Sequence, residues 1–135
     1  MQTLTEIRSL LNAWGARPAK KLGQCFLIDL NLMRKLIALA DPAPGSRLLE
    51  VGAGTGSLTE ELLRLVTAGG AEGQVIACEI DANLHRLLAS RFCGVRSLTL
   101  LACDVLASKH EIQPDLLEAL RPGPASMVSN LPYSI

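Results

Sequence analysis

Four consecutive residues at positions 130–133 combine groups that suit chemistry on a planar base. The exocyclic amine of adenine is a poor nucleophile because its lone pair is delocalised into the ring. The Asn130 side-chain oxygen and the Leu131 carbonyl can accept its protons and direct the lone pair, while Tyr133 offers a face for a flipped-out base. Positioning such an amine against a sulfonium methyl donor needs no metal and no unusual general base. In isolation, the tetrapeptide also fits a plain turn that ends a strand.

A glycine-rich turn follows an apolar stretch at 47–52 and precedes a helical pattern. Gly52, Gly54 and Gly56 let the backbone turn tightly and leave room for a ligand at the helix N-terminus. Their G-x-G-x-G spacing differs from the G-x-G-x-x-G pattern of dinucleotide-binding folds. The difference favours S-adenosylmethionine over a nicotinamide cofactor, which remains the alternative for the loop taken alone.

Two acidic residues follow later apolar stretches. Glu79 ends the stretch at 74–80 and can accept hydrogen bonds from ribose hydroxyls, whereas Asp81 suits the N-cap of the next helix. Asp104 follows the stretch at 98–103 and can accept from the exocyclic amine of a cofactor adenine. An ordinary turn residue is the competing interpretation for Asp104.

The elements that must position these residues alternate along the chain. Short apolar runs alternate with helical stretches of roughly ten residues, which is typical of βα units with a parallel sheet. The expected strands are 47–52, 74–80, 98–103 and 126–130, and the expected helices between them are 57–67, 82–91 and 111–120. The predicted fold is therefore α/β and Rossmann-like, with helices flanking a parallel sheet.

Two further helices are predicted before the first strand. Thr3 and Glu6 have capping-box spacing and precede an amphipathic stretch that Gly15 ends. Asp29 can cap a second helix, which ends at Asp41. We expect residues 1–28 to form a helix and a basic loop, and residues 29–135 to form the α/β domain.

Composition points to one globular domain in a reducing compartment. The chain has 135 residues, is 49% hydrophobic and carries no formal net charge. Basic residues gather before position 36, where they can touch phosphates or simply form a solvated face. The four cysteines show no C-x-x-C pair, so reduced thiols are expected and a zinc site is not. With no signal peptide and no apolar run long enough for a membrane span, we expect a cytoplasmic protein.

Taken together, the motifs resemble the family that dimethylates adjacent adenines of small-subunit ribosomal RNA. Its relatives include the erythromycin-resistance methyltransferases and the mitochondrial transcription factors B. The resemblance extends from about residue 20 to residue 135 and is carried by KLGQCFL, EVGAGTGSLT, CEID, CDVL and NLPYSI, in that order.

The resemblance implies a class I S-adenosylmethionine-dependent methyltransferase that acts on ribosomal RNA of the small subunit. Its cofactor site would be lined by Cys25, Leu27, Gly52, Gly54, Glu79, Asp104 and Asn130. The target adenine would meet Asn130, Leu131 and Tyr133. The family usually has Asn at the position of Cys25, so a side-chain hydrogen bond to the cofactor is weakened there. A non-catalytic relative and a DNA adenine methyltransferase are the competing readings.

Family members continue past this tetrapeptide with further strands and a helical domain. The chain is therefore expected to be the N-terminal part of such an enzyme, ending just after the loop that holds the target base. Little or no methyl transfer is expected from this polypeptide alone.

Overall fold

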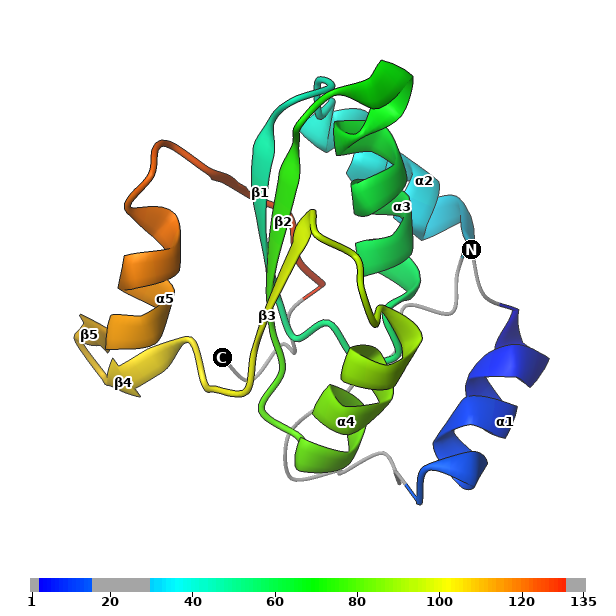
Figure 1. Cartoon of the computed structure of the whole chain (residues 1–135). Coiled ribbons are helices and arrows are strands. Elements are labelled where there is room, and N and C mark those ends of the chain that lie inside the picture. The colour runs from blue at the N-terminus through cyan, green and yellow to red at the C-terminus, as the bar shows by residue number, and fades with distance from the viewer. Residues whose placement is uncertain (1–2, 16–29, 131–135) are drawn as a thin grey trace.

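A parallel four-stranded sheet forms the centre of the structure (Figure 1). The computed structural model describes residues 3–15 and 30–130. The strand order across the sheet is β3-β2-β1-β6. The strands are β1 (Arg47–Val51), β2 (Gln74–Cys78), β3 (Leu98–Leu101) and β6 (Ser126–Met127). Strand β1 therefore lies between β2 and β6, which places the loop after β1 in the middle of the sheet edge.

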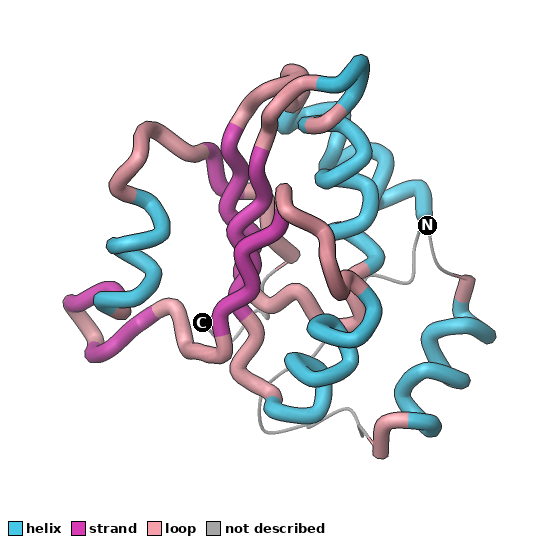
Figure 2. Tube along the Cα trace, in the orientation of Figure 1, coloured by secondary structure: helices cyan, strands magenta, loops and turns pink. Residues whose placement is uncertain are grey.

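Helices cover both faces of this sheet, and the Rossmann-like α/β prediction is confirmed (Figure 2). On one face, α2 (Leu30–Ala40), α3 (Ser57–Val66) and α4 (Ala82–Arg91) pack against the sheet; on the other lies α5 (Pro114–Leu120). A short 3-10 turn, Ala68–Gly70, follows α3. Side chains alternate between the two faces as a strand requires, with Val75 facing the α3 core and Ile76 facing α5. None of the helices within 3–15 and 30–130 could cross a bilayer.

Helix α1 (Leu4–Ala13) begins with the predicted capping box. The Glu6 amide donates to Thr3 Oγ1 at 3.3 Å, and the Thr3 amide donates to Glu6 Oε2 at 2.6 Å. These bonds satisfy amides that a helix N-terminus leaves without partners. Ile7 and Leu11 are buried against Leu84, so α1 packs on α4.

The region between β3 and α5 differs from the sequence-based prediction. A helix was expected over 111–120, but α5 begins at Pro114 and is preceded by an antiparallel pair, β4 (Leu106–Ser108) and β5 (Glu111–Ile112). Proline suits the first helical position and disfavours helical backbone in the residue before it. Gln113 accordingly has φ −54° and ψ 131°. The hairpin was missed because both strands are exposed and have only three and two residues, too few to show an alternating pattern.

All four strands are shorter than predicted, and β1 ends at Val51 instead of residue 52. Strand β2 ends at Cys78, β3 at Leu101 and β6 at Met127, whereas their apolar stretches run on to 80, 103 and 130. The ladder stops where the chain bends away at the carboxyl edge of the sheet. Apolar composition therefore marked the strands correctly but could not mark where pairing ends.

Arg47 at the start of β1 ties α5 to the sheet. Its guanidinium donates to the carbonyl of Ala119 at 2.7 Å and to the carbonyl of Gly123 at 2.6 Å, with a longer bond to Leu120 at 3.3 Å. A cation at a helix C-terminus satisfies carbonyls that the helix leaves unpaired and complements its dipole. The contact also fixes the turn that leads into β6.

Replacing Arg47 with Met should destabilise the fold, because the apolar stem stays while the charged donors are lost. Hydrogen bonds to charged groups contribute roughly 1.5–3 kcal/mol each, so a loss of about 2–4 kcal/mol in the free energy of unfolding is expected. Urea denaturation measures it. Arg121→Met is the matched control, since Arg121 is exposed and pairs with Glu118 on the surface, and it should cost about 1 kcal/mol or less. Equal effects of the two substitutions would contradict the anchoring role.

Candidate functional site

The loops at the carboxyl ends of the four parallel strands meet along one edge of the sheet. In spatial order they carry Asp104 after β3, Glu79 after β2, the glycine loop after β1, and Asn130 after β6. Ligands of open α/β sheets bind outside the carboxyl ends of the strands. The structure therefore brings the described members of the predicted site to one edge, although they lie far apart in the sequence.

Four consecutive backbone amides at the end of β1 are bonded to groups from the neighbouring strands. Val51 N–H donates to Ser129 Oγ at 2.8 Å, and the amides of Gly52 and Ala53 both donate to the Cys78 carbonyl, at 2.9 and 3.1 Å. The Gly54 amide donates to Glu79 Oε2 at 2.8 Å. Buried amides must find partners. The shape of this loop is consequently set by the ends of β2 and β6.

Glu79 has a buried carboxylate that links the glycine loop to the turn after β2. One oxygen accepts from Gly54, and the other accepts from the Asp81 amide at 2.9 Å. A carboxylate has about four acceptor positions, so capacity for hydroxyl donors remains. Asp81 caps α4 by accepting from the amides of Asn83 and Leu84, at 2.8 and 3.0 Å. The predicted cap at Asp81 is confirmed, and the ribose role of Glu79 stays a prediction.

The three loop glycines have left-handed backbone but different surroundings. Their φ angles are +73°, +61° and +81° for Gly52, Gly54 and Gly56. Among the residues that the structure describes, a Cβ on Gly52 would meet nothing within 4 Å, whereas one on Gly56 would lie 2.7 Å from side-chain atoms of Leu88 and Phe92. The first glycine thus leaves open space beside the backbone, and the third permits close packing of the loop on α4.

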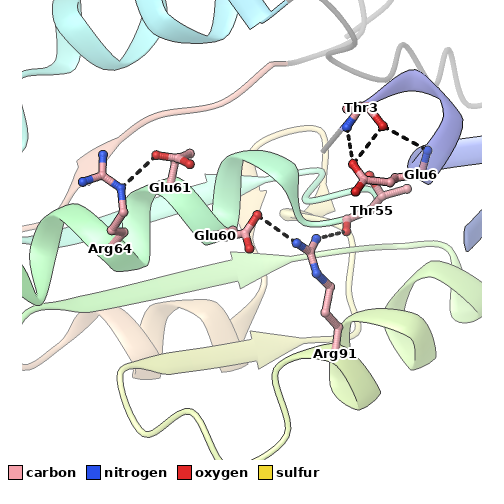
Figure 3. Close-up of polar contacts among 7 residues, drawn as sticks. All are labelled: Thr3, Glu6, Thr55, Glu60, Glu61, Arg64 and Arg91. Carbon is pink, nitrogen blue, oxygen red and sulfur yellow. Dashed lines mark hydrogen bonds and ion pairs between the residues drawn. The ribbon is translucent and has the colours of Figure 1, made fainter. Parts of the chain in front are cut away.

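Arg91, the last residue of α4, contacts the glycine loop and the first turn of α3 (Figure 3). Its guanidinium donates to the Thr55 carbonyl at 2.7 Å and pairs with Glu60 at 2.9 Å. It also lies 5.0 Å from the centre of the Phe92 ring. Sequence reasoning missed this residue, because an arginine in the last turn of a helix is ordinary and nothing in its spacing relates it to the loop 36 residues earlier.

Asp104 is exposed, and its carboxylate accepts from the Leu106 amide at 3.2 Å, which is the arrangement of a turn. The turn interpretation therefore describes Asp104 in the structure, and its cofactor role remains a prediction. Asn130 is half-buried at the end of the described chain. The remaining predicted site residues lie outside the described residues: Cys25, Leu27, Leu131 and Tyr133.

The cysteines that the structure describes are free thiols, namely Cys78, Cys93 and Cys103. Burial raises the pKa of Cys78 to about 12, and the adjacent Cys103 thiol adds to the shift. Cys78 is therefore protonated at neutral pH and serves as a small apolar residue in the core.

Comparison with known proteins shows the family of this chain. A model of ribosomal RNA adenine dimethylase matches residues 16–135. The chain belongs to the ribosomal RNA adenine dimethylase family. Ribosomal RNA small subunit methyltransferase A of Dehalococcoides mccartyi is 35% identical over 98% of this chain. The protein of the same name from Phenylobacterium zucineum is 39% identical over 100% of this chain. The chain spans about 42–43% of these relatives.

Solved structures show the same relationship. The 23S rRNA methyltransferase ErmE is 28% identical, with a TM-score of 0.62 over 82% of this chain and 39% of that protein. A dimethyladenosine transferase from Plasmodium falciparum shares the fold, with a TM-score of 0.58. The predicted family and fold class are confirmed.

Glu50 is a further acidic residue of this dimethylase-family site, and sequence reasoning did not single it out. It precedes the glycine loop on β1, is buried, and accepts from Thr59 Oγ1 at 2.7 Å. Burial raises the pKa of Glu50 to about 8, opposed by the Thr59 hydrogen bond and helped by the nearby charge of Glu79. At neutral pH the Glu50 carboxyl group is therefore largely neutral.

Glu50 makes the stability of this family member depend on pH. Because the folded pKa lies above its ordinary value of 4.5, the folded state binds more protons, and stability should fall as pH rises from about 4.5 to 8. Glu50→Gln keeps an acceptor for Thr59 and should remove most of this slope, leaving a variant more stable than wild type at pH 9 by a few kcal/mol, at about 1.4 kcal/mol per pKa unit. Urea denaturation across pH 5–9 tests it, and parallel slopes for the two proteins would contradict it.

Proposed function

We propose that this chain forms the cofactor-binding and base-binding part of an S-adenosylmethionine-dependent N6-dimethyltransferase for adenines of small-subunit ribosomal RNA. The main support for this proposal is the buried carboxylate of Glu79. It accepts a hydrogen bond from Gly54 of the glycine loop, in which Gly52 leaves space beside the backbone. Asn130 follows the strand on the other side of the same loop. Family membership and the small-subunit names of the similar relatives support the proposed substrate.

The described residues fit S-adenosylmethionine. The open space at Gly52 lets a ligand lie against the backbone, and the free acceptor positions of Glu79 suit the two hydroxyls of a ribose. Ile80, directly after Glu79, exposes 53% of its surface and offers an apolar contact at the same edge. Asp104 would bind the adenine amine of the cofactor once its carboxylate faces the ligand.

The cofactor supplies an electrophilic methyl group on a sulfonium. In this proposal the Asn130 oxygen and the Leu131 carbonyl hold the protons of the target amine, and Tyr133 stacks on the base. Bound there, S-adenosylmethionine would give its methyl group to the amine nitrogen and would leave as the neutral thioether, and the amine would release one proton to water. Positioning accounts for the rate, and a second round on the same amine gives the dimethylated product. We infer a cytoplasmic site of action, where ribosomal subunits are assembled.

Calorimetric titration of the chain with S-adenosylhomocysteine tests the cofactor site, with NAD as the control ligand. Saturable binding of the first ligand alone is expected. Glu79→Gln should weaken this binding at least about tenfold, because charge-assisted hydrogen bonds to the ribose are lost. Glu72→Gln, which alters an exposed carboxylate on the loop before β2, should bind like wild type. Binding of NAD alone would refute the proposal, and thermal melts show whether each variant is folded.

Arg91→Met should weaken the binding of S-adenosylhomocysteine by roughly fivefold, since the loop loses one charge-assisted hydrogen bond worth on the order of 1 kcal/mol. Arg86→Met is the matched control, because Arg86 lies earlier on α4, is exposed and donates to the Asn83 side chain, away from the glycine loop. The same titration measures both. Unchanged affinity in Arg91→Met would show that the loop keeps its shape without this contact.

A further inference from the structure

Ser129 occupies the position between the last paired strand residue and the proposed base-binding tetrapeptide. Strand β6 pairs with β1 at Ser126 and Met127, and the Val128 amide then donates to the Leu49 carbonyl at 2.9 Å. In a regular parallel ladder, the next bond would run from the Val51 amide to a backbone carbonyl of β6. The structure shows instead that this amide donates to the Ser129 hydroxyl at 2.8 Å.

The Ser129 hydroxyl therefore ends the backbone ladder while it keeps β1 and the segment after β6 together. Val51 is buried, with 8% of its surface exposed, so its amide needs a protein partner. Because a side chain supplies that partner, the backbone carbonyls after Met127 are not needed to pair with Val51, and regular pairing ends immediately before Asn130.

The same hydrogen bond relates the two halves of the proposed site. Val51 directly precedes Gly52, where the cofactor loop begins, and Ser129 directly precedes Asn130. On the proposed function, those two segments carry the methyl donor and the acceptor amine. Transfer requires the reacting atoms to be about 3–3.5 Å apart and aligned, so the separation of the two segments controls the rate.

We propose that Ser129 is a positioning residue that sets Asn130 against the cofactor loop through its bond to the Val51 amide. This inference rests on the proposed function, because it assigns Asn130 to the target amine. It predicts that loss of the hydroxyl affects methyl transfer far more than cofactor binding, since the loop keeps its bonds to Cys78 and Glu79.

Three substitutions in the full chain separate this role from general stability. Ser129→Ala removes the acceptor, Ser129→Thr restores it, and Ser126→Ala makes the same chemical change at an exposed position of β6. Amide exchange followed by nuclear magnetic resonance reports the Val51 bond, and the Asn130 amide resonances report the position of the tetrapeptide. Calorimetry gives the affinity for S-adenosylhomocysteine. Since little methyl transfer is expected from this chain, single-turnover transfer of tritiated methyl groups to small-subunit RNA is measured at high protein concentration, and the residual rates of the variants are compared.

In Ser129→Ala, we expect amide exchange at Val51 to become at least about tenfold faster and methyl transfer at least about tenfold slower. The affinity for S-adenosylhomocysteine should stay within about threefold of wild type. The Asn130 resonances should move. Ser129→Thr and Ser126→Ala should resemble wild type in every measurement. Faster Val51 exchange with an unchanged transfer rate would overturn the inference, as would a parallel loss of cofactor affinity.

The design also distinguishes failure of the inference from failure of the proposed function. A wild-type chain that neither binds S-adenosylhomocysteine nor transfers methyl groups would count against the proposed function. The Asn130 resonances then decide the positioning role, since displacement in Ser129→Ala alone supports it and unchanged resonances overturn it. If the wild-type chain binds S-adenosylhomocysteine but transfers no methyl group, the Asn130 resonances decide the positioning role of Ser129 by the same criterion.

Discussion

The backbone amides of residues 51–54 each donate to a group from a neighbouring segment of the sheet edge. The acceptors come from both neighbouring strands: the Cys78 carbonyl and the Glu79 carboxylate at the end of β2, and the Ser129 hydroxyl after β6. These hydrogen bonds join three segments of the sheet edge into one structure. The glycine loop is thus held by its hydrogen bonds and not by its glycines alone.

Other parts of the fold serve this edge from a distance. Arg47 holds the end of α5 and the turn before β6, which determines where Ser129 arrives beside β1. Arg91 and the close packing at Gly56 hold the far side of the loop against α4. Helix α1 in turn covers α4 through Ile7 and Leu11. Contacts on both faces of the sheet, from α4 on one and from α5 on the other, therefore hold the segments that carry the glycine loop and Ser129.

Two acidic side chains at the centre of the site have opposite electrostatic roles. The Glu79 carboxylate accepts hydrogen bonds from backbone amides of the loop and of the turn after β2, whereas burial keeps Glu50 largely neutral at pH 7. A charge on Glu50 would be repelled by Glu79 and would disfavour the folded state. Protonation of Glu50 removes that repulsion beside the glycine loop.

Local sequence patterns determined helices α1, α3 and α4, the central strands and the caps at Thr3 and Asp81, but not the start of α5. The Thr3–Glu6 box, the Asp81 cap and the apolar stretches of β1 and β2 depend on neighbours within a few residues, so their order along the chain was sufficient. The motifs likewise indicated the dimethylase family. Strand ends, the exposed β4–β5 hairpin and the contacts of Ser129 and Arg91 were decided only by tertiary structure. Each depends on which backbone groups remain unpaired once distant segments meet, and that is a property of the assembled sheet.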